Sequence, residues 1–366
     1  MESSTVRPEW AYCGGGPAMP SRKAEQIVKI LREEILSGKR AKGSRLPTYD
    51  ALVEEFQVTR PTIARVVALL REEGLITDKG DRSLFVADEF PHQTRYLWIT
   101  SVEPGSQEWT NFLSTLLSVI EHEETGIEGT VVPLTGVDGR ANNPSYQLLC
   151  EVIEQGSAAG LLLMNSATVY LLPVLQEPGM PRVAISAPLP HAGLVTLDFE
   201  GLIDRACRKL VEKGQRIAVI SPHANNLVAA EQRLLALGVP KDRLWPLHVG
   251  PIGSEHVTEL LFDRNEHPDA LFITDDNLVE PMLEGLRRAH VLPGEDVYVL
   301  AHCNWPRPYG LEAGIEHIGF DVREVLATCK QMIDAQRAGD PTPTAKVSPR
   351  FLSELVLPMR ERTSNV

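Results

Sequence analysis

Basic and hydroxyl side chains gather at the start of one short segment of helical periodicity. The apolar residues of this segment form one stripe, whereas Arg65 falls opposite the stripe and Thr62 on its flank. Thr59 is placed to cap the helix, and Pro61 suits a first turn, where a backbone N–H has no intrahelical partner. The side chains of Arg60, Thr62 and Arg65 can hydrogen-bond phosphates and base edges in a DNA major groove. Their types and spacing therefore predict a nucleic-acid interface.

A second set of polar side chains follows short apolar runs later in the chain. The residues at or just beyond the ends of these runs are Asp198, Asp275, Asp276, His302 and Asn304. Because ligands bind beyond the carboxyl ends of strands in open parallel sheets, these residues predict a small-molecule site. Short polar groups beside an aromatic ring suit a hydroxylated ligand, and Trp109 is the candidate platform for a sugar ring. The alternatives are a core role for Trp109, a helix-capping role for Asp198 and Asp276, and an ordinary loop role for His302.

A helix that presents polar residues to DNA must be held by neighbouring elements, which the sequence provides on both sides. Upstream, Pro47 and Thr48 suit the start of a helix whose apolar residues share one face, and Gln57–Val58 form the turn between the two helices. A still earlier segment also keeps helical spacing. Downstream, residues 74–86 predict two short strands around a basic turn, Lys79–Arg82. This order predicts a winged helix-turn-helix domain.

Residues 35–86, which read ILSGKRAKGSRLPTYDALVEEFQVTRPTIARVVALLREEGLITDKGDRSLFV, resemble the GntR family of winged helix-turn-helix repressors. By position, the resemblance places the DNA contacts of that family, with their basic neighbours, on Arg45, Thr59, Arg60, Pro61, Thr62, Arg65, Lys79, Gly80 and Arg82. Two positions depart from the family pattern. Ala64 stands where a second recognition-helix arginine is usual, and Gly80-Asp81-Arg82 replaces Gly-x-Gly in the wing. A winged helix that binds protein is the alternative.

The chain has 366 residues and a formal net charge of −13, and the distribution of this charge decides what it implies. Residues 21–90 hold 13 Lys and Arg against 12 Asp and Glu, so the acidity lies in the later, larger part. DNA binding through local phosphate contacts is compatible with this distribution, and an acidic body suppresses non-specific binding. The five cysteines are scattered without a Cys-x-x-Cys pair, which predicts neither a zinc site nor a disulfide framework and fits a reducing cytoplasm.

The order of segments predicts two folded domains after a short tail. Residues 1–20 are expected to be disordered, 21–90 to form the DNA-binding domain and 91–95 a linker broken by Pro91. No apolar run of membrane-spanning length and no basic-then-apolar start occurs, so neither a membrane span nor export is expected. From residue 96 to 366, short apolar runs alternate with amphipathic helical segments, which predicts an α/β fold of doubly wound parallel sheets in two lobes.

Several stretches of this body, among them VTLDFEGLIDRACRKLVEKGQRIAVIS and GIEHIGFDVREVLATCKQMIDAQRAGD, resemble the LacI-type effector domain, which has the periplasmic-binding-protein fold. The resemblance implies three crossings between the lobes, near residues 200–215, 304–312 and 340, and a ligand between them. Two ligand anchors of that family are altered. Asn226 stands where an arginine usually opens an Arg-x-x-Gly-aromatic motif, and Ala301-His302-Cys303-Asn304 replaces Gly-aromatic-Asp. Either the ligand differs from a typical free sugar, or the pocket has lost its ligand.

These observations predict a cytoplasmic homodimer that binds operator DNA, most simply as a repressor, and responds to a small molecule such as a sugar or a sugar derivative. No cofactor, metal or catalytic residue is expected, because the sequence has no nucleophile elbow, zinc motif, phosphate-binding loop or dinucleotide fingerprint. Two alternatives stay open. One is a DNA-binding protein whose effector pocket is degenerate, and the other is a transport-type binding protein, which the winged helix opposes.

Overall fold

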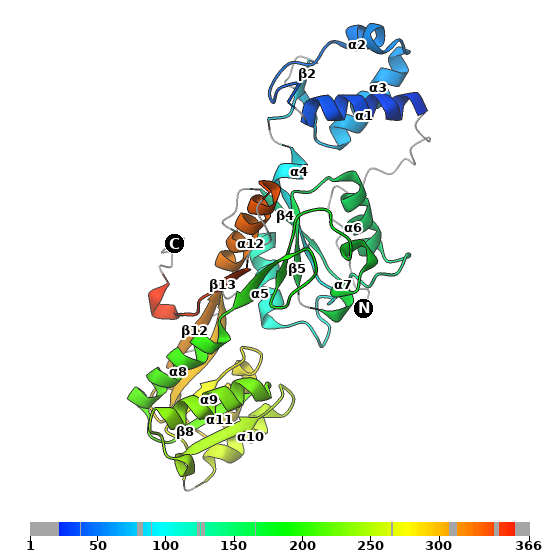
Figure 1. Ribbon diagram of the computed structural model, residues 1–366. Coiled ribbons are helices and arrows are strands. Elements are labelled where there is room, and N and C mark those ends of the chain that lie inside the picture. Colours follow the sequence, from blue (N-terminus) through cyan, green and yellow to red (C-terminus); the bar gives the residue numbers. More distant parts are fainter. Residues whose placement is uncertain are drawn as a thin grey trace, which may run out of the picture. The chain divides into compact units, whose positions relative to one another are not determined.

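The structure is a computed structural model that divides into two compact units, Met1–Thr94 and Arg95–Val366 (Figure 1). The described residues are 22–36, 38–78, 83–88, 90–122, 125, 129–164, 166–264, 266–306, 313–339 and 344–355. The predicted tail at residues 1–20 lies outside these ranges. Within them, no helix is both long enough and apolar enough to cross a bilayer.

The first unit is the predicted winged helix-turn-helix. In chain order its elements are α1 (Arg22–Leu36), α2 (Tyr49–Phe56), α3 (Arg60–Glu72), β1 (Ile76–Asp78), β2 (Leu84–Val86) and α4 (Pro91–Thr94). The Thr48 hydroxyl accepts a hydrogen bond from the Ala51 N–H (3.3 Å) and so caps α2. Gln57 ends α2 with a φ of 51°, which turns the chain toward α3. Apolar stripes of α1, α2 and α3 and the antiparallel β1–β2 pair enclose one core.

The segment predicted to be a linker, residues 91–95, contains the short helix α4 and lies where the two units divide. Pro91 opens α4 rather than breaking structure, because its missing N–H would have no partner in a first turn. The preceding Phe90 is buried and its carbonyl accepts a hydrogen bond from the Thr94 hydroxyl (3.3 Å). Arg95 already belongs to the first strand of the second unit.

The described residues of the second unit form two six-stranded sheets, and each sheet defines a lobe. The lobe 1 sheet has the order β13 (Thr344–Val347), β7 (Gly193–Leu197), β6 (Arg182–Ile185), β5 (Gly160–Met164), β3 (Arg95–Ile99) and β4 (Thr130–Leu134). The lobe 2 sheet has the order β14 (Arg350–Phe351), β12 (Ile315–Asp321), β11 (Tyr298–Trp305), β10 (Ala270–Ile273), β8 (Ile217–Ser221) and β9 (Leu244–His248). All strand pairs are parallel except β12–β14.

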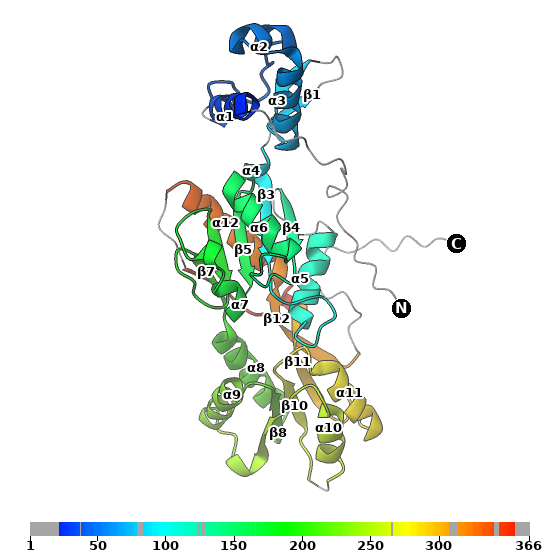
Figure 2. The ribbon, with the colours of Figure 1, turned by 90° about the vertical axis from the view of Figure 1, so that its right-hand side faces the viewer.

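Helices cover both faces of each sheet, which confirms the predicted doubly wound α/β class. In lobe 1, one face carries α5 (Asn111–Glu121) and α12 (Val322–Arg337), and the other carries α6 (Pro144–Gln155) and α7 (Ala167–Tyr170). In lobe 2, α8 (Phe199–Lys213) and α9 (Ala224–Ala236) lie opposite α10 (Ser254–Phe262) and α11 (Val279–Arg288), as Figure 2 shows. Short 3₁₀ turns occur at Pro173–Leu175, Lys241–Arg243 and Leu352–Glu354.

In the described residues the chain passes between the lobes at three places, and the second and third differ from the predicted ones. It enters lobe 2 at Asp198, returns at Asp321–Val322, and crosses again at 348–349. The crossing predicted near 304–312 is wrong, because β11 and β12 on either side of it are parallel neighbours in one sheet. The crossing predicted near 340 comes later, because β13 first adds a strand to lobe 1. The first crossing precedes the predicted span 200–215, since α8 already packs in lobe 2.

Candidate functional sites

The start of α3 presents polar side chains outward because its apolar stripe is buried. The buried residues of this helix are Ile63, Val66, Val67 and Leu70. Arg60 and Pro61 are exposed, whereas Thr62 and Arg65 are half-buried. Thr59 precedes the helix in an extended conformation, and its hydroxyl lies 2.9 Å from the hydroxyl of Thr62. The fold therefore gathers five of the predicted DNA-contacting residues at one helix start.

The guanidinium of Arg60 is held by two consecutive residues of α2. Its Nη1 donates a hydrogen bond to Oδ1 of Asp50 at 3.1 Å, and its Cζ lies 6.0 Å from the centre of the Tyr49 ring. The side chains of Arg60 and Asp50 are 68% and 76% exposed, so a nucleic acid can reach both. Asp50 and Tyr49 are not among the predicted residues. The signal for Asp50 is an acidic residue in the first turn of the helix before the recognition helix.

Arg45 lies beside the wing rather than on a helix. It forms an isolated antiparallel bridge with Phe85 of β2, and its Nη2 donates a hydrogen bond to the Ser83 hydroxyl at 2.6 Å. This pairing fixes the basic side chain next to the two short strands. The predicted contacts at the tip of the same wing lie outside the described residues; they are Lys79, Gly80 and Arg82.

Three buried polar side chains meet at the carboxyl edge of the lobe 2 sheet. His302 and Asn304 lie two residues apart in β11, so they point to the same face of the sheet. Thr274 directly follows β10, whose last residue, Ile273, is in register with Ala301, so Thr274 is level with His302. The exposed fractions of Thr274, His302 and Asn304 are 2%, 5% and 2%. We call these three residues the polar cluster.

The polar cluster offers several hydrogen-bonding atoms that no described residue of the protein contacts. The Thr274 hydroxyl, both ring nitrogens of His302 and Oδ1 of Asn304 have no hydrogen-bond partner among the described residues. Leaving a buried polar group unpaired costs about 1–3 kcal/mol, so such groups are normally paired. The cluster is therefore suited to bind a small polar molecule through hydroxyl or similar groups.

The imidazole of His302 also marks where the lobes meet. Its ring centre lies 5.8 Å from that of Phe199 and 6.0 Å from that of Phe320. Phe199 begins α8 just after the first crossing. Phe320 lies at the end of β12, just before the second crossing. The polar cluster therefore adjoins two of the connections between the lobes.

Asp276 connects the polar cluster to the opposite lobe. Its Oδ2 accepts a hydrogen bond from Nδ2 of Asn304 (2.7 Å), and its carbonyl accepts one from Nδ2 of Asn111 (2.8 Å). Asn111 begins α5 in lobe 1, and its N–H donates to Oδ1 of Asn277 (2.9 Å). Asp275 accepts hydrogen bonds from both nitrogens of Asn277 (2.9 and 2.7 Å), which fixes the orientation of that amide. One residue of lobe 1 thus makes two hydrogen bonds across the junction.

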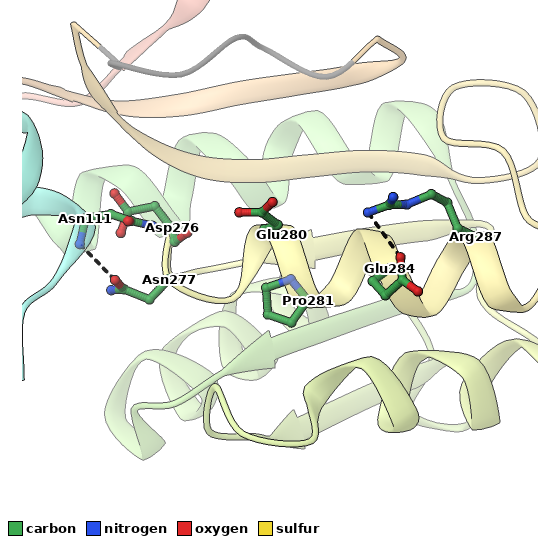
Figure 3. A pocket seen from close by; sticks show the side chains of 7 residues that line it. All are labelled: Asn111, Asp276, Asn277, Glu280, Pro281, Glu284 and Arg287. Atoms are coloured by element: carbon green, nitrogen blue, oxygen red, sulfur yellow. Dashed lines mark hydrogen bonds and ion pairs between the residues drawn. The ribbon is translucent and has the colours of Figure 1, made fainter. Parts of the chain in front are cut away.

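A pocket of about 480 Å³ opens at this junction. Its lining consists of Asn111, Asp276, Asn277, Glu280, Pro281, Glu284 and Arg287, as Figure 3 shows. Arg287 forms an ion pair with Glu284 at 3.3 Å. Three carboxylates against one guanidinium make the lining acidic, so it favours a neutral or cationic ligand over an anionic one.

The other predicted ligand residues take different positions. The Trp109 ring packs edge-on against Trp98 at 6.4 Å, and its Nε1 donates a hydrogen bond to the Ser114 hydroxyl (2.8 Å). Asp198 caps α8 by accepting a hydrogen bond from the Gly201 N–H (3.1 Å). Asn226 lies half-buried in the first turn of α9, after β8. These three residues do not belong to the lining of the described pocket.

Some residues of the junction were not among the predicted site residues. Thr274 ends an apolar run just before Asp275, so its position at a strand end is a usable signal. Asn111 has no such signal, because nothing in its neighbourhood indicates a contact 165 residues away.

Comparison with known proteins agrees with this division into two units. Residues 23–86 match the family described as Bacterial regulatory proteins, gntR family. No curated protein matches the chain. The structure is similar to a regulatory protein of the LacI family from Chloroflexus aggregans, with 17% identity, 72% of this chain and 97% of the other covered, and a TM-score of 0.55.

Two further solved structures of the same fold contain a bound sugar. One is a LacI family transcriptional regulator from Enterococcus faecium with bound ribose (18% identity, 71% and 96% covered, TM-score 0.53). The other is a periplasmic binding protein/LacI transcriptional regulator from Alkaliphilus metalliredigens complexed with D-xylulofuranose (14% identity, 71% and 97% covered, TM-score 0.51). Both predicted resemblances, of the first unit and of the second, are confirmed.

Proposed function

Because residues 23–86 are a gntR-family DNA-binding domain and the second unit has the fold of LacI-type effector domains, we propose that this transcription regulator is a sequence-specific repressor controlled by a small molecule. The effector binds between the lobes, at the polar cluster and the adjoining pocket. The observation that carries this proposal is the set of buried polar atoms on Thr274, His302 and Asn304 that have no hydrogen-bond partner within the described part of the chain. Family and fold are those of regulators rather than of enzymes.

DNA is read by the start of α3. Arg60 and Arg65 supply guanidinium groups for guanine or phosphate, and Thr62 supplies a hydroxyl. Arg45 and the wing contact the backbone beside it. A single winged helix covers few base pairs, so the regulator works as a homodimer on two half-sites in the cytoplasm. Sedimentation of the full chain tests this state, and a monomer at micromolar concentration would contradict it.

The effector is a sugar or a sugar derivative. A hydroxyl group can donate to Oδ1 of Asn304 and accept from the hydroxyl of Thr274, while the two ring nitrogens of His302 offer further hydrogen-bonding positions. The ribose and D-xylulofuranose bound to two proteins of the same fold support this class. The acidic pocket lining disfavours a phosphate ester of such a sugar.

Binding is coupled to DNA affinity through the junction of the lobes. A ligand held by lobe 2 residues beside Asn111 strengthens the arrangement in which Asn111 bonds to Asp276 and Asn277. It can shift the balance only by its differential affinity for the two arrangements, typically about 1–3 kcal/mol. Since β3 of lobe 1 follows the DNA-binding unit directly, movement of the lobes changes the spacing of the two DNA-binding units in a dimer.

The test begins with thermal shift and calorimetry of the full chain against pentoses, hexoses, sugar alcohols and amino sugars. The ligands that bind are then added to an operator titration. We expect at least one neutral or cationic sugar to bind and to change operator affinity about five- to 150-fold. Sequence-specific DNA binding that no compound alters would instead support the degenerate-pocket alternative.

A further inference from the structure

We infer that Asp50 is a specificity-determining residue of the DNA-binding surface. The inference rests on the proposed sequence-specific binding of DNA by the start of α3. Asp50 is the second residue of α2, and its carboxylate accepts a hydrogen bond from Nη1 of Arg60, the first residue of α3, at 3.1 Å. The Tyr49 ring supports the same guanidinium at 6.0 Å. An acidic side chain therefore stands within the surface that meets DNA.

Among the ion pairs between described residues of the first unit, this is the one in which both side chains are more than half exposed. Both of its side chains are about 70% exposed or more, whereas the pair of Arg32 and Glu73 is only 36% and 24% exposed. Arg40 is 16% exposed where it contacts Glu34 and Glu55. Shielded pairs of this kind hold the fold together. The open pair lies where DNA phosphates can compete with the Asp50 carboxylate.

The charge of the unit makes this competition matter. Residues 21–90 hold 13 basic and 12 acidic residues, so general electrostatic attraction to DNA is weak. When Arg60 approaches a phosphate at an arbitrary sequence, it exchanges one anionic partner for another. Asp50 therefore offsets most of the contribution that Arg60 would make to the affinity for non-specific DNA.

At the correct sequence the same pair acts differently. A guanidinium carries five N–H donors, and Asp50 uses one nitrogen, Nη1. Nη2 and Nε remain available for a bidentate contact with a guanine edge. Asp50 and Tyr49 then hold the guanidinium in position, so the base contact forms without loss of the ion pair. Asp50 thus suppresses non-specific binding more than operator binding.

The experiment compares the full-length protein with its Asp50→Asn variant. The operator is a duplex selected from a random library by the wild type, and the competitor is a mixed-sequence duplex of equal length. Affinities are measured by fluorescence anisotropy over a series of salt concentrations. Glu72→Gln is the matched control. Glu72 is also exposed, and this substitution removes one negative charge about 18 Å along α3 from Arg60.

Asp50→Asn should raise affinity for the mixed duplex about two- to fivefold relative to Glu72→Gln. The slope of log K for the mixed duplex against log salt concentration should also become steeper, by the amount that one additional phosphate contact contributes. Operator affinity should change less, so the specificity ratio falls. The inference would be overturned if the two variants changed affinity for the mixed duplex equally, or if Asp50→Asn left the specificity ratio unchanged. Failure of the wild type to select any sequence would count against the proposed function instead.

The Arg60→Ala background separates positioning from simple repulsion. If Asp50 acts through Arg60, the further change Asp50→Asn in this background should leave the specificity ratio unaltered. If the specificity ratio instead falls as much as it does in the wild-type background, Asp50 acts independently of Arg60. This result would overturn the inference.

Discussion

The side-chain amide of Asn111 donates a 2.8 Å hydrogen bond to the carbonyl of Asp276, which lies 165 residues later in the chain and in the other lobe. The N–H of Asn111 donates a second bond, to Asn277 at 2.9 Å. Both acceptors line the pocket, and Asp276 also accepts a bond from Asn304 of the polar cluster. A ligand bound in this pocket would touch the contacts that join the lobes, so its binding free energy could alter their arrangement.

Asn111→Ala should weaken effector binding by about three- to tenfold, because it removes one hydrogen bond worth about 1 kcal/mol from the ligand-bound arrangement. Calorimetry of the full chain with the sugar found by screening measures this change. Asn142→Ala, in an exposed loop of the same lobe, is the control. Equal affinities of the two variants would show that the junction contact does not contribute to binding.

Thr274→Val separates a ligand contact from a packing role. Valine has nearly the same shape as threonine, and the Thr274 hydroxyl has no partner among the described residues, so the melting temperature should stay the same or rise. Effector affinity should fall about tenfold with the loss of one bond to the sugar. In the control Thr328→Val, the lost hydroxyl bonds within α12 to Glu324, and effector affinity should be unchanged. A lower melting temperature with normal binding would assign Thr274 to packing.

The acidic pocket lining predicts selection by charge. A phosphate ester of the effector sugar should bind at least about tenfold more weakly than the free sugar, because Asp276, Glu280 and Glu284 repel it. Glu280→Gln should narrow this difference, since Glu280 is exposed at the pocket. Competition binding with matched pairs of sugar and sugar phosphate gives the ratio directly. Tighter binding of the phosphate would contradict the assignment of the effector to this pocket.

The buried thiols should be unreactive in the folded protein. Burial raises the pKa of Cys207 and of Cys329 to about 12, so both remain protonated at pH 8, and only the thiolate is nucleophilic. Iodoacetamide at pH 8 followed by peptide mapping should leave both residues unmodified until denaturant is added. Reaction in native buffer at a rate similar to that of the denatured chain would show that these helices open readily.

Much of the fold follows from local pattern. The apolar stripe of α3 and the continuous apolar runs of strands such as β5 and β10 are visible in sequence because burial requires them. The second and third crossings were misplaced for a physical reason. The sequence at the end of a strand does not reveal whether the next strand belongs to the same sheet. β12 is recognised as a lobe 2 strand only through its pairing with β11.

The candidate site was predictable only in part. Asp276, His302 and Asn304 could be proposed as candidates because ends of parallel strands are common ligand positions. Their hydrogen bonds could not, since the contact between Asn304 and Asp276 depends on the register of β10 and β11. The cross-lobe role of Asn111 depends on tertiary placement alone. Direct effector contacts of Trp109, Asp198 and Asn226 stay predictions.

The central claim is that an effector bound at Asp276 controls DNA affinity, and an operator titration with and without the sugar tests it most directly. For Asp276→Ala, operator affinity without sugar should stay within about twofold of the wild type, while the sugar-induced change should fall by about tenfold or more. Asp242→Ala, exposed elsewhere in lobe 2, should respond like the wild type. A normal sugar response of Asp276→Ala would contradict the account, and so would a wild type whose operator affinity no sugar changes.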